Sequence, residues 1–449
     1  MQTKGKKKII DNAGALQKKY AWKSEKTQDT KKAPQDTKKP AAVCPYAKKC
    51  GGCDYQGMSY EQQLQEKQTY VRKNIGDYCK VLPIIGMENP YHYRNKVHAV
   101  FDVERRGKHA NGGRRTAGNG HAKAAPGGVI SGVYKAGTHE VINIDSCEIE
   151  DELSSAIIRD IRGLLHSFKI KTYDEDTGYG LLRHVLVRRG FHSGEVMVVL
   201  VLGSPILPSK NNFVKALRKL HPEITTVVVS INDKQTSMVL GEKETVIYGK
   251  GYIEDTLCGC TFRISPKSFY QVNPVQTEVL YGTALEYAGL TGKETVWDVY
   301  CGIGTISLFL AQKAQKVYGV EIVPQAIEDA KHNAEINEIT NAEFFVGKAE
   351  EVLPEYYADY AKEHPGEHAR ADVIVVDPPR KGCERSVLDT MVQMEPERIV
   401  YVSCDSATLA RDVKYLRENG YEIRKVKATD MFPMSVHVEV VCCLHRVNS

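Results

Sequence analysis

The sequence contains no apolar run long enough to cross a bilayer, which takes about 20 consecutive apolar residues in a helix. Its N-terminus is rich in lysine, but no apolar stretch follows, so the pattern of a secretory signal is missing. No internal repeat is visible, and 42% of the residues are hydrophobic, an ordinary fraction for a soluble protein with packed cores. We therefore expect a cytoplasmic protein without a membrane partner.

Cysteine is sparse, because twelve residues are spread over a chain of 449, too few for a disulfide scaffold of this length. The length itself corresponds to two or three domains. Since nothing in the sequence points to export, we expect the thiols to be core, metal-binding or catalytic residues.

Arginine is absent from residues 1–43, although this segment holds twelve lysines against four acidic residues, a balance of +8. Because the whole chain carries +5, the remainder carries −3. A lysine-rich arm on a mildly acidic body is typical of nucleic-acid binders, in which such cations neutralise phosphates. A solubilising tail is the alternative. Since the arm is also poor in apolar residues, we expect it to be disordered.

The residues after the arm divide into two predicted domains, 44–262 and 263–449. In the first domain, residues 60–75 have a helical pattern with Ser59 as N-cap, and this helix can pack on the second domain. A segment at 105–128, rich in Gly, Arg and His, predicts a long basic loop.

Residues 148–262 combine a helical pattern at about 151–168 with apolar strand patterns such as HVLVRRG and EVMVVLVLG. The first domain is therefore expected to be α+β. Its basic loop is expected to contribute to RNA binding, because basic side chains neutralise phosphates.

After Phe262, short apolar strands alternate with helical segments, which predicts a parallel, doubly wound α/β sheet. The strand segments are TVWDVYC, KVYGVEI, AEFFVGK, DVIVVDPP and RIVYVSC. The last two strand patterns, YEIRKVKATDMF and VHVEVVCCL, follow each other without a helix. We expect them to close the sheet as an antiparallel pair.

A glycine-rich turn at 298–304 (DVYCGIG) lies between a predicted strand and a predicted helix. Glycines at such a turn allow the backbone to approach a ligand closely. The spacing differs from the dinucleotide pattern, so a pyrophosphate is not the expected ligand. Glu321 ends the next strand, where an acidic side chain can bind both hydroxyls of an adenosine ribose. A generic nucleotide-binding domain is the alternative.

Two further strand ends carry reactive groups, Asp377 before Pro-Pro-Arg and Cys404 after Ser403. Ligands of open α/β sheets bind outside the carboxyl ends of the strands, so both groups should face one pocket. A thiolate that adds to carbon 6 of a uracil raises the electron density at carbon 5, which can then accept a methyl group. Glu439, inside an otherwise apolar strand pattern, is a candidate base for the carbon 5 proton. A buried core cysteine is the alternative for Cys404.

Cys44, Cys50 and Cys53 form a tight triplet, and Cys147 is a distant fourth candidate. Structural zinc sites usually show two close pairs, whereas a triplet with one remote thiolate suits a cubane iron–sulfur cluster. Three thiols within ten residues, flanked by Gly and Lys, make a poor core. We therefore predict a [4Fe–4S] cluster in the first domain, with zinc as the alternative.

Five segments together resemble the RNA 5-methyluridine methyltransferases: SFYQVN (268–273), DVYCGIGT (298–305), DPPRKG (377–382), VYVSCDSATLARD (400–412) and HVE (437–439). The resemblance covers most of the chain from Cys44 onward. It implies a class I methyltransferase fold and S-adenosyl-L-methionine as methyl donor. It further implies that the donor is contacted by Gln271, Tyr300, Glu321 and Asp377, that the nucleophile is Cys404 and that the base is Glu439.

The cysteine spacing is similar to that of the ribosomal RNA branch of this family, whose members hold a [4Fe–4S] cluster. In that branch the fourth ligand lies in a segment like INIDSCEIED, which here contains Cys147. Two departures stand out. Asp405-Ser406 replaces the common Asn-Pro after the nucleophile, and residues 1–43 are too short and polar for the TRAM-type RNA-binding domain of many members.

The resemblance implies methylation of carbon 5 of a uridine in RNA, with 23S ribosomal RNA as the expected substrate. We expect a monomer, although the sequence itself does not determine the oligomeric state. A transfer RNA uridine C5 methyltransferase is the alternative, although that branch generally lacks the cysteine triplet. A non-catalytic RNA-binding assembly factor would be favoured by loss of Cys404 or Glu439, and both are present. A redox protein built around the cluster would leave the donor pocket unexplained.

Overall fold

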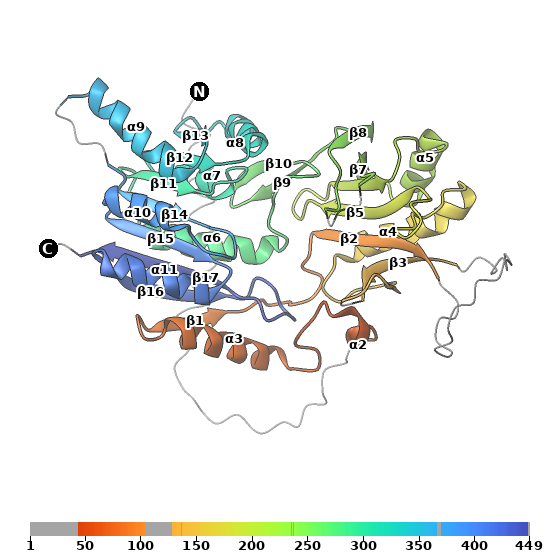
Figure 1. Ribbon diagram of the computed structural model, residues 1–449, viewed down its shortest axis with the longest axis horizontal. Coiled ribbons are helices and arrows are strands. Elements are labelled where there is room, and N and C mark those ends of the chain that lie inside the picture. Colours follow the sequence, from red (N-terminus) through yellow and green to blue (C-terminus); the bar gives the residue numbers. More distant parts are fainter. Residues whose placement is uncertain are drawn as a thin grey trace.

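The computed structural model describes residues 44–104, 128–135, 137–234, 236, 238–365 and 370–447. The predicted disordered arm at 1–43 lies outside the described residues, as does the predicted basic loop apart from its last residue. Within the described residues, no helix is long and apolar enough to cross a membrane. Two sheets with their own helices lie side by side (Figure 1).

The larger sheet has eight strands in the order β1-β16-β17-β15-β14-β11-β12-β13. β17 lies between β15 and β16 and is antiparallel to both, while the other neighbouring strands are parallel. The predicted doubly wound sheet and its antiparallel closure are therefore confirmed. The strands are β1 (Val81–Ile85), β11 (Thr295–Val299), β12 (Lys316–Glu321), β13 (Ala342–Val346), β14 (Val373–Val376), β15 (Arg398–Ser403), β16 (Tyr421–Thr429) and β17 (Glu439–Arg446).

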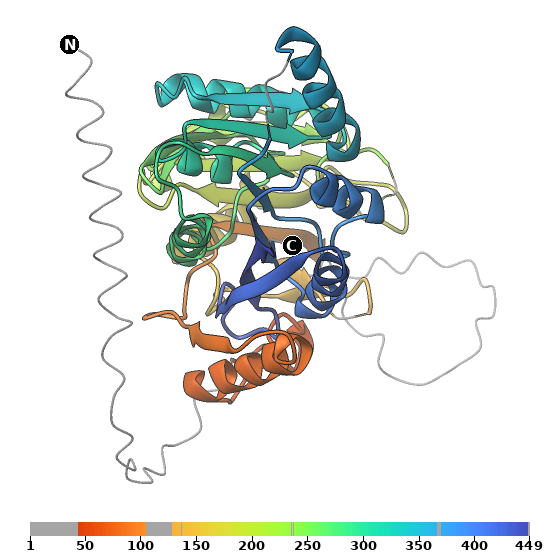
Figure 2. The ribbon, with the colours of Figure 1, turned by 90° about the vertical axis from the view of Figure 1, so that its left-hand side faces the viewer.

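Helices cover both faces of the larger sheet (Figure 2). One apolar core forms under α6 (Pro274–Ala288), α7 (Thr305–Ala311) and α8 (Pro324–Ile336). A second core forms under the helices of the opposite face, where strand residues such as Trp297 and Tyr401 are fully buried. Those helices are α3 (Tyr60–Ile75), α9 (Ala349–Glu363), α10 (Arg385–Gln393) and α11 (Ser406–Glu418).

Helix α3 begins where the sequence predicts. The Ser59 hydroxyl accepts a hydrogen bond from the backbone of Gln62 (3.2 Å), and the Gln62 side chain accepts one from the Ser59 backbone (3.0 Å). This reciprocal capping box satisfies two backbone N–H groups at the helix start.

The predicted boundary at residue 262 is wrong for two segments. β1 joins the larger sheet, in which Val81 pairs with Val426 of β16. The hairpin of β9 (Ile253–Leu257) and β10 (Cys260–Ile264) buries its apolar side chains in the core under α6 to α8. Both contacts join residues far apart in sequence, which a local pattern does not reveal.

The second sheet has seven strands in the order β4-β3-β2-β5-β6-β7-β8. α4 (Glu152–Ser167) and α5 (Lys210–Leu220) cover one face. Leu186 and Met197 on the other face join the core around the β9–β10 hairpin, which lies between the two lobes (Figure 1). The strands are β2 (Lys96–Val103), β3 (Val129–Tyr134), β4 (Val141–Asn143), β5 (Leu182–Arg189), β6 (Val196–Leu202), β7 (Ile224–Ile231) and β8 (Lys243–Tyr248).

Candidate functional site

Four parallel strands bring their carboxyl ends to one edge of the larger sheet. Val299 of β11 pairs with Val320 of β12 on one side and with Val376 of β14 on the other, and Val376 pairs with Tyr401 of β15. The residues that follow these positions therefore lie at the same edge, which is where open α/β sheets bind ligands. They include four of the predicted site residues: Tyr300, Glu321, Asp377 and Cys404.

The glycine-rich turn after β11 has an unusual backbone. Tyr300 has a φ of 71°, and Gly302 and Gly304 have φ values of 55° and 83°. A Cβ at Gly304 would lie 3.2 Å from Ala330 and from Phe344. Glycine is therefore required at 304 both by its backbone conformation and by packing. At Tyr300 the left-handed conformation is held by a non-glycine residue, a strain that is common at functional sites.

A cavity of about 560 Å³ opens beside this turn, large enough for a cofactor-sized ligand. Its walls include Tyr300, Glu321 and Asp377. Phe269, 71% exposed, also lines it, whereas Gln271 is not among its described walls. The backbone carbonyl of Gln271 instead accepts a hydrogen bond from the Asn95 side chain at 3.2 Å.

Carboxyl groups give this cavity its electrostatic character. Burial raises the pKa of Asp377 above its usual range. Behind the turn, Asp298 is fully buried, and its pKa is raised to about 7 by burial, with Asp377 and Glu321 adding to the shift. One Asp298 oxygen accepts a hydrogen bond from Ser307 (2.5 Å), and the other has no partner. Such a cavity favours a positively charged ligand, which would stabilise the ionised carboxylates.

Cys404 lies between the end of β15 and the start of α11. Its side chain is half-buried, and burial raises the thiol pKa to about 11, with Glu439 and Asp377 adding to the shift and Arg380 opposing it. Asp405 caps α11, because its carboxylate accepts hydrogen bonds from the backbones of Ala407 and Thr408. Cys404 is thereby fixed at the N-terminus of a helix, one of the settings that favour a thiolate.

Glu439 is the first residue of β17, opposite Thr429 of β16. The sequence pattern places it inside a strand beginning at Val436, which is wrong because residues 436–438 belong to the preceding turn. The side chain is 5% exposed, and burial raises its pKa, with Asp377 adding to the shift. The Asp377 and Glu439 carboxyl groups both raise the pKa of the Cys404 thiol, so the three groups lie in one neighbourhood.

Arg380 and His437, for which the sequence predicts no role in the site, lie beside Cys404 and Glu439. The Arg380 guanidinium donates to His437 Nε2 at 3.3 Å, and the Arg380 carbonyl accepts from the Thr408 hydroxyl at 3.2 Å. Arg380 also opposes the rise in pKa of both Cys404 and Glu439. It is a cation placed among otherwise acidic groups, and its position after Asp377-Pro-Pro is the sequence signal that could have identified it.

The four cysteines predicted to bind metal lie in one region. Cys53 and Cys147 pack against the cluster of Tyr93, Ile149 and Met434. Burial raises the pKa of the Cys53 thiol, with Cys50 and Cys44 adding to the shift. However, no group of three or more His, Cys, Asp or Glu side chains in the described residues is arranged to hold a metal ion. The geometry therefore does not confirm the predicted cluster.

The chain is similar to known proteins in both sequence and fold. The model of a family described as tRNA (Uracil-5-)-methyltransferase matches residues 192–447. An uncharacterized RNA methyltransferase of Bacillus cereus is 46% identical over 412 residues, covering 91% of this chain and 83% of its own. A relative from Halalkalibacterium halodurans with the same description is also 46% identical, covering 91% of this chain and 84% of its own.

The crystal structure of Pyrococcus abyssi tRNA (uracil-54, C5)-methyltransferase in complex with S-adenosyl-L-homocysteine has the same fold, with a TM-score of 0.68 and 27% identity. The similarity covers 88% of this chain and 85% of that one. Together, the matched family and the relatives show that this chain belongs to the RNA 5-methyluridine methyltransferase family.

Proposed function

We propose that this protein transfers the methyl group of S-adenosyl-L-methionine to carbon 5 of a uridine in 23S ribosomal RNA, with Cys404 as nucleophile and Glu439 as general base. The observation that carries the proposal is the placement of the Cys404 thiol, the Asp377 carboxyl and the Glu439 carboxyl within electrostatic reach of one another, beside a cavity that Asp377 also lines.

The residues around the cavity fit the methyl donor. When bound, S-adenosyl-L-methionine supplies an electrophilic methyl group on a positively charged sulfonium. Glu321 is suited to the ribose hydroxyls, and its Oε1 already accepts a hydrogen bond from the Val323 backbone at 3.0 Å, which orients the carboxylate. Tyr300 and Asp377 would complete the contacts from the neighbouring strand ends. Gln271 does not line the cavity, but Phe269, two residues earlier, does, so Gln271 would approach the donor from that side.

Cys404 would begin the reaction as a thiolate. Its sulfur forms a bond to carbon 6 of the uracil, and the displaced π electrons move through carbon 5 onto the carbonyl oxygen at carbon 4. Carbon 5 is then nucleophilic and would take the methyl group, with the electron pair of the broken S–CH3 bond left on the donor sulfur as a neutral thioether. Arg380 is the nearby cation that favours the thiolate and opposes the negative charge of the surrounding carboxyl groups.

Glu439 would complete the reaction. Its carboxylate removes the proton from carbon 5, the electron pair of that C–H bond re-forms the double bond to carbon 6, and the sulfur leaves as a thiolate. Because Glu439 is nearly excluded from water and its pKa is raised, it is a stronger base than an exposed carboxylate.

The RNA substrate is assigned from the cysteine triplet, which resembles that of the ribosomal RNA branch. Transfer RNA is the second candidate, because the Pyrococcus abyssi enzyme of similar fold is a tRNA (uracil-54, C5)-methyltransferase. We expect ribosomal RNA from a strain lacking this gene to lose 5-methyluridine, as measured by mass spectrometry of nuclease digests. Loss from transfer RNA alone would overturn the ribosomal assignment, while loss from neither RNA would contradict the methyltransferase proposal itself.

We also propose that Cys44, Cys50, Cys53 and Cys147 bind a [4Fe–4S] cluster. The support is that the described thiols gather in one partly buried region and that Cys53 is within electrostatic range of the other three. Anaerobically purified protein should contain about four iron and four sulfide per chain. The Cys147→Ser variant should lose most of both. Stoichiometric zinc without sulfide would show that the site is of another kind.

Replacing Glu321 by Ala should weaken donor binding about tenfold or more, because each hydrogen bond to a charged group contributes roughly 1.5–3 kcal/mol. Calorimetric titration with S-adenosyl-L-homocysteine measures the change. RNA affinity should stay nearly constant, and Glu328→Ala on the exposed face of α8 is the matched control. Unchanged donor affinity in Glu321→Ala would remove this residue from the donor site.

Variants of Cys404 and Glu439 should fail at different steps. Cys404→Ala should form no covalent complex with RNA. Glu439→Gln keeps the size of the side chain but not its basicity, so addition and methyl transfer proceed while elimination stops. A methylated protein–RNA complex should therefore survive denaturing gels with Glu439→Gln but not with Cys404→Ala.

A 5-fluorouridine RNA provides an independent measurement of the same step, since fluorine does not leave as a proton does. The wild-type enzyme should be trapped on this RNA, and peptide mapping should find the crosslink at Cys404. Cys79→Ala, which removes another partly exposed thiol, is the control and should be trapped normally. A crosslink at any other cysteine would contradict the assigned nucleophile.

A further inference from the structure

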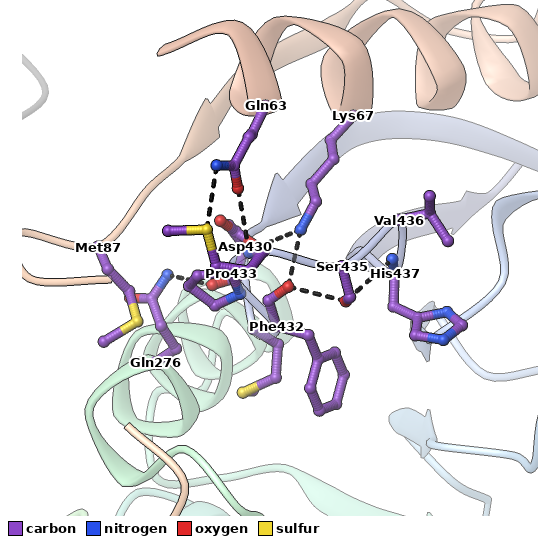
Figure 3. A network of polar contacts seen from close by, with 12 residues as sticks. Gln63, Lys67, Met87, Gln276, Asp430, Phe432, Pro433, Ser435, Val436 and His437 are labelled. Atoms are coloured by element: carbon purple, nitrogen blue, oxygen red, sulfur yellow. Dashed lines mark hydrogen bonds and ion pairs between the residues drawn. The ribbon is translucent and has the colours of Figure 1, made fainter. Parts of the chain in front are cut away.

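The segment Asp430–Val438 joins β16 to β17 and leads directly into Glu439, the first residue of β17. It contains no helix or strand, and partners from distant parts of the chain bind its backbone (Figure 3). The Lys67 ammonium donates to Asp430 Oδ1 at 2.6 Å and to the Phe432 carbonyl at 3.0 Å. Both charged side chains of this pair are fully excluded from solvent, so the start of the segment is fixed by a buried ion pair.

Met434, in the middle of the segment, has a φ of 69°, which a residue other than glycine rarely adopts. The Gln63 side chain binds it from α3, since Gln63 Oε1 accepts from the Met434 N–H at 3.0 Å and Gln63 Nε2 donates to the Met434 sulfur at 3.2 Å. The Met434 carbonyl accepts from the backbone N–H groups of Asp54 (2.9 Å) and Tyr55 (3.1 Å). A disfavoured conformation of this kind persists only when the surroundings determine it.

Asp54 makes a second contact with the same segment. Its Oδ2 accepts a hydrogen bond from the Val436 N–H at 3.0 Å, three residues before Glu439. Asp54 directly follows Cys53, which packs on Met434 together with Cys147. The cysteine-bearing segment and the turn that leads to the base are therefore in direct contact, although about 380 residues separate Asp54 from Val436 in the sequence.

We infer that Asp54 and Gln63 are positioning residues for the general base: they hold Met434 and Val436 so that the chain enters β17 with the Glu439 carboxylate directed at the carbon 5 proton. The inference rests on the proposed function. It also gives the cysteine-bearing segment a role in the reaction that requires no electron transfer, since ordering this segment orders the turn that carries the base.

Asp54→Ala removes the acceptor of the Val436 N–H, and Asp54→Asn, which keeps an oxygen at that place, is the matched control. Full-length variants are incubated with labelled S-adenosyl-L-methionine and total RNA from the deletion strain. With Asp54→Ala, methyl transfer in the first turnover should remain near the wild-type rate, while release of methylated RNA should slow about tenfold or more. The labelled protein–RNA complex should accumulate on denaturing gels as with Glu439→Gln, and Asp54→Asn should behave like the wild type.

Gln63→Ala provides a second variant if Asp54→Ala does not fold, and it should accumulate the same complex. Release at the wild-type rate from the folded Asp54→Ala or Gln63→Ala enzyme would overturn the inference. So would a parallel loss of methyl transfer and release without any labelled complex, because that result indicates a general structural role. Failure of the wild-type enzyme to be trapped by 5-fluorouridine would instead refute the proposed function, independently of these variants.

Discussion

The free-energy cost of removing charge from water determines how readily side chains ionise at the edge where the parallel strands of the larger sheet end. Burial raises the pKa values of Cys404, Asp377 and Glu439, and the Asp377 carboxylate adds to the rise at Cys404 and Glu439. The free site therefore favours neutral groups. In the proposed reaction the thiol and the base must both ionise, so positive charge has to be supplied. Arg380 provides part of it, and the sulfonium of the donor would provide the rest. Burial thus makes the reactive groups more basic and also ties their ionisation to a filled donor cavity.

A second constraint is that the larger sheet, which carries the candidate site, is built from both the N-terminal and the C-terminal parts of the chain. β1 adds an eighth strand beside β16, and α3 packs on α11, so residues before position 86 complete the sheet and one of its cores. The buried pair of Lys67 and Asp430 joins these parts. Such a pair contributes little net stability, but removing one partner leaves an uncompensated buried charge. Lys67 also donates to the Phe432 carbonyl, so the pair fixes the start of the turn after β16 against α3.

The sequence suffices for features that depend on local pattern. Alternation of apolar strands and helices predicts the doubly wound sheet, and the residue types at strand ends place Tyr300, Glu321, Asp377 and Cys404 at one edge. Contacts between distant segments carry no local signal. For that reason the sequence does not predict three contacts. These are the pairing of Val81 with Val426, the contacts of Asp54 with Met434 and Val436, and the packing of the β9–β10 hairpin in the larger core. The position of Glu439 at the start of β17 is not predicted either, because Val436–Val438 look like strand and lie in a turn.

The departure at Asp405-Ser406 shows how the loop of Cys404, the proposed nucleophile, is held when the common Asn-Pro is missing. Asp caps a helix about as well as Asn, so the first change leaves α11 capped. Ser406 lacks the fixed φ that proline provides at the first helical position. Its hydroxyl instead accepts a hydrogen bond from the Asn74 amide at 2.7 Å, which ties the loop to α3. The same helix carries Gln63, eleven residues earlier and about 16 Å away along the helix axis. The two ends of α3 thus contact the loop of Cys404 and the turn before Glu439, while the pairing of Ser403 with Val440 holds these two residues beside each other.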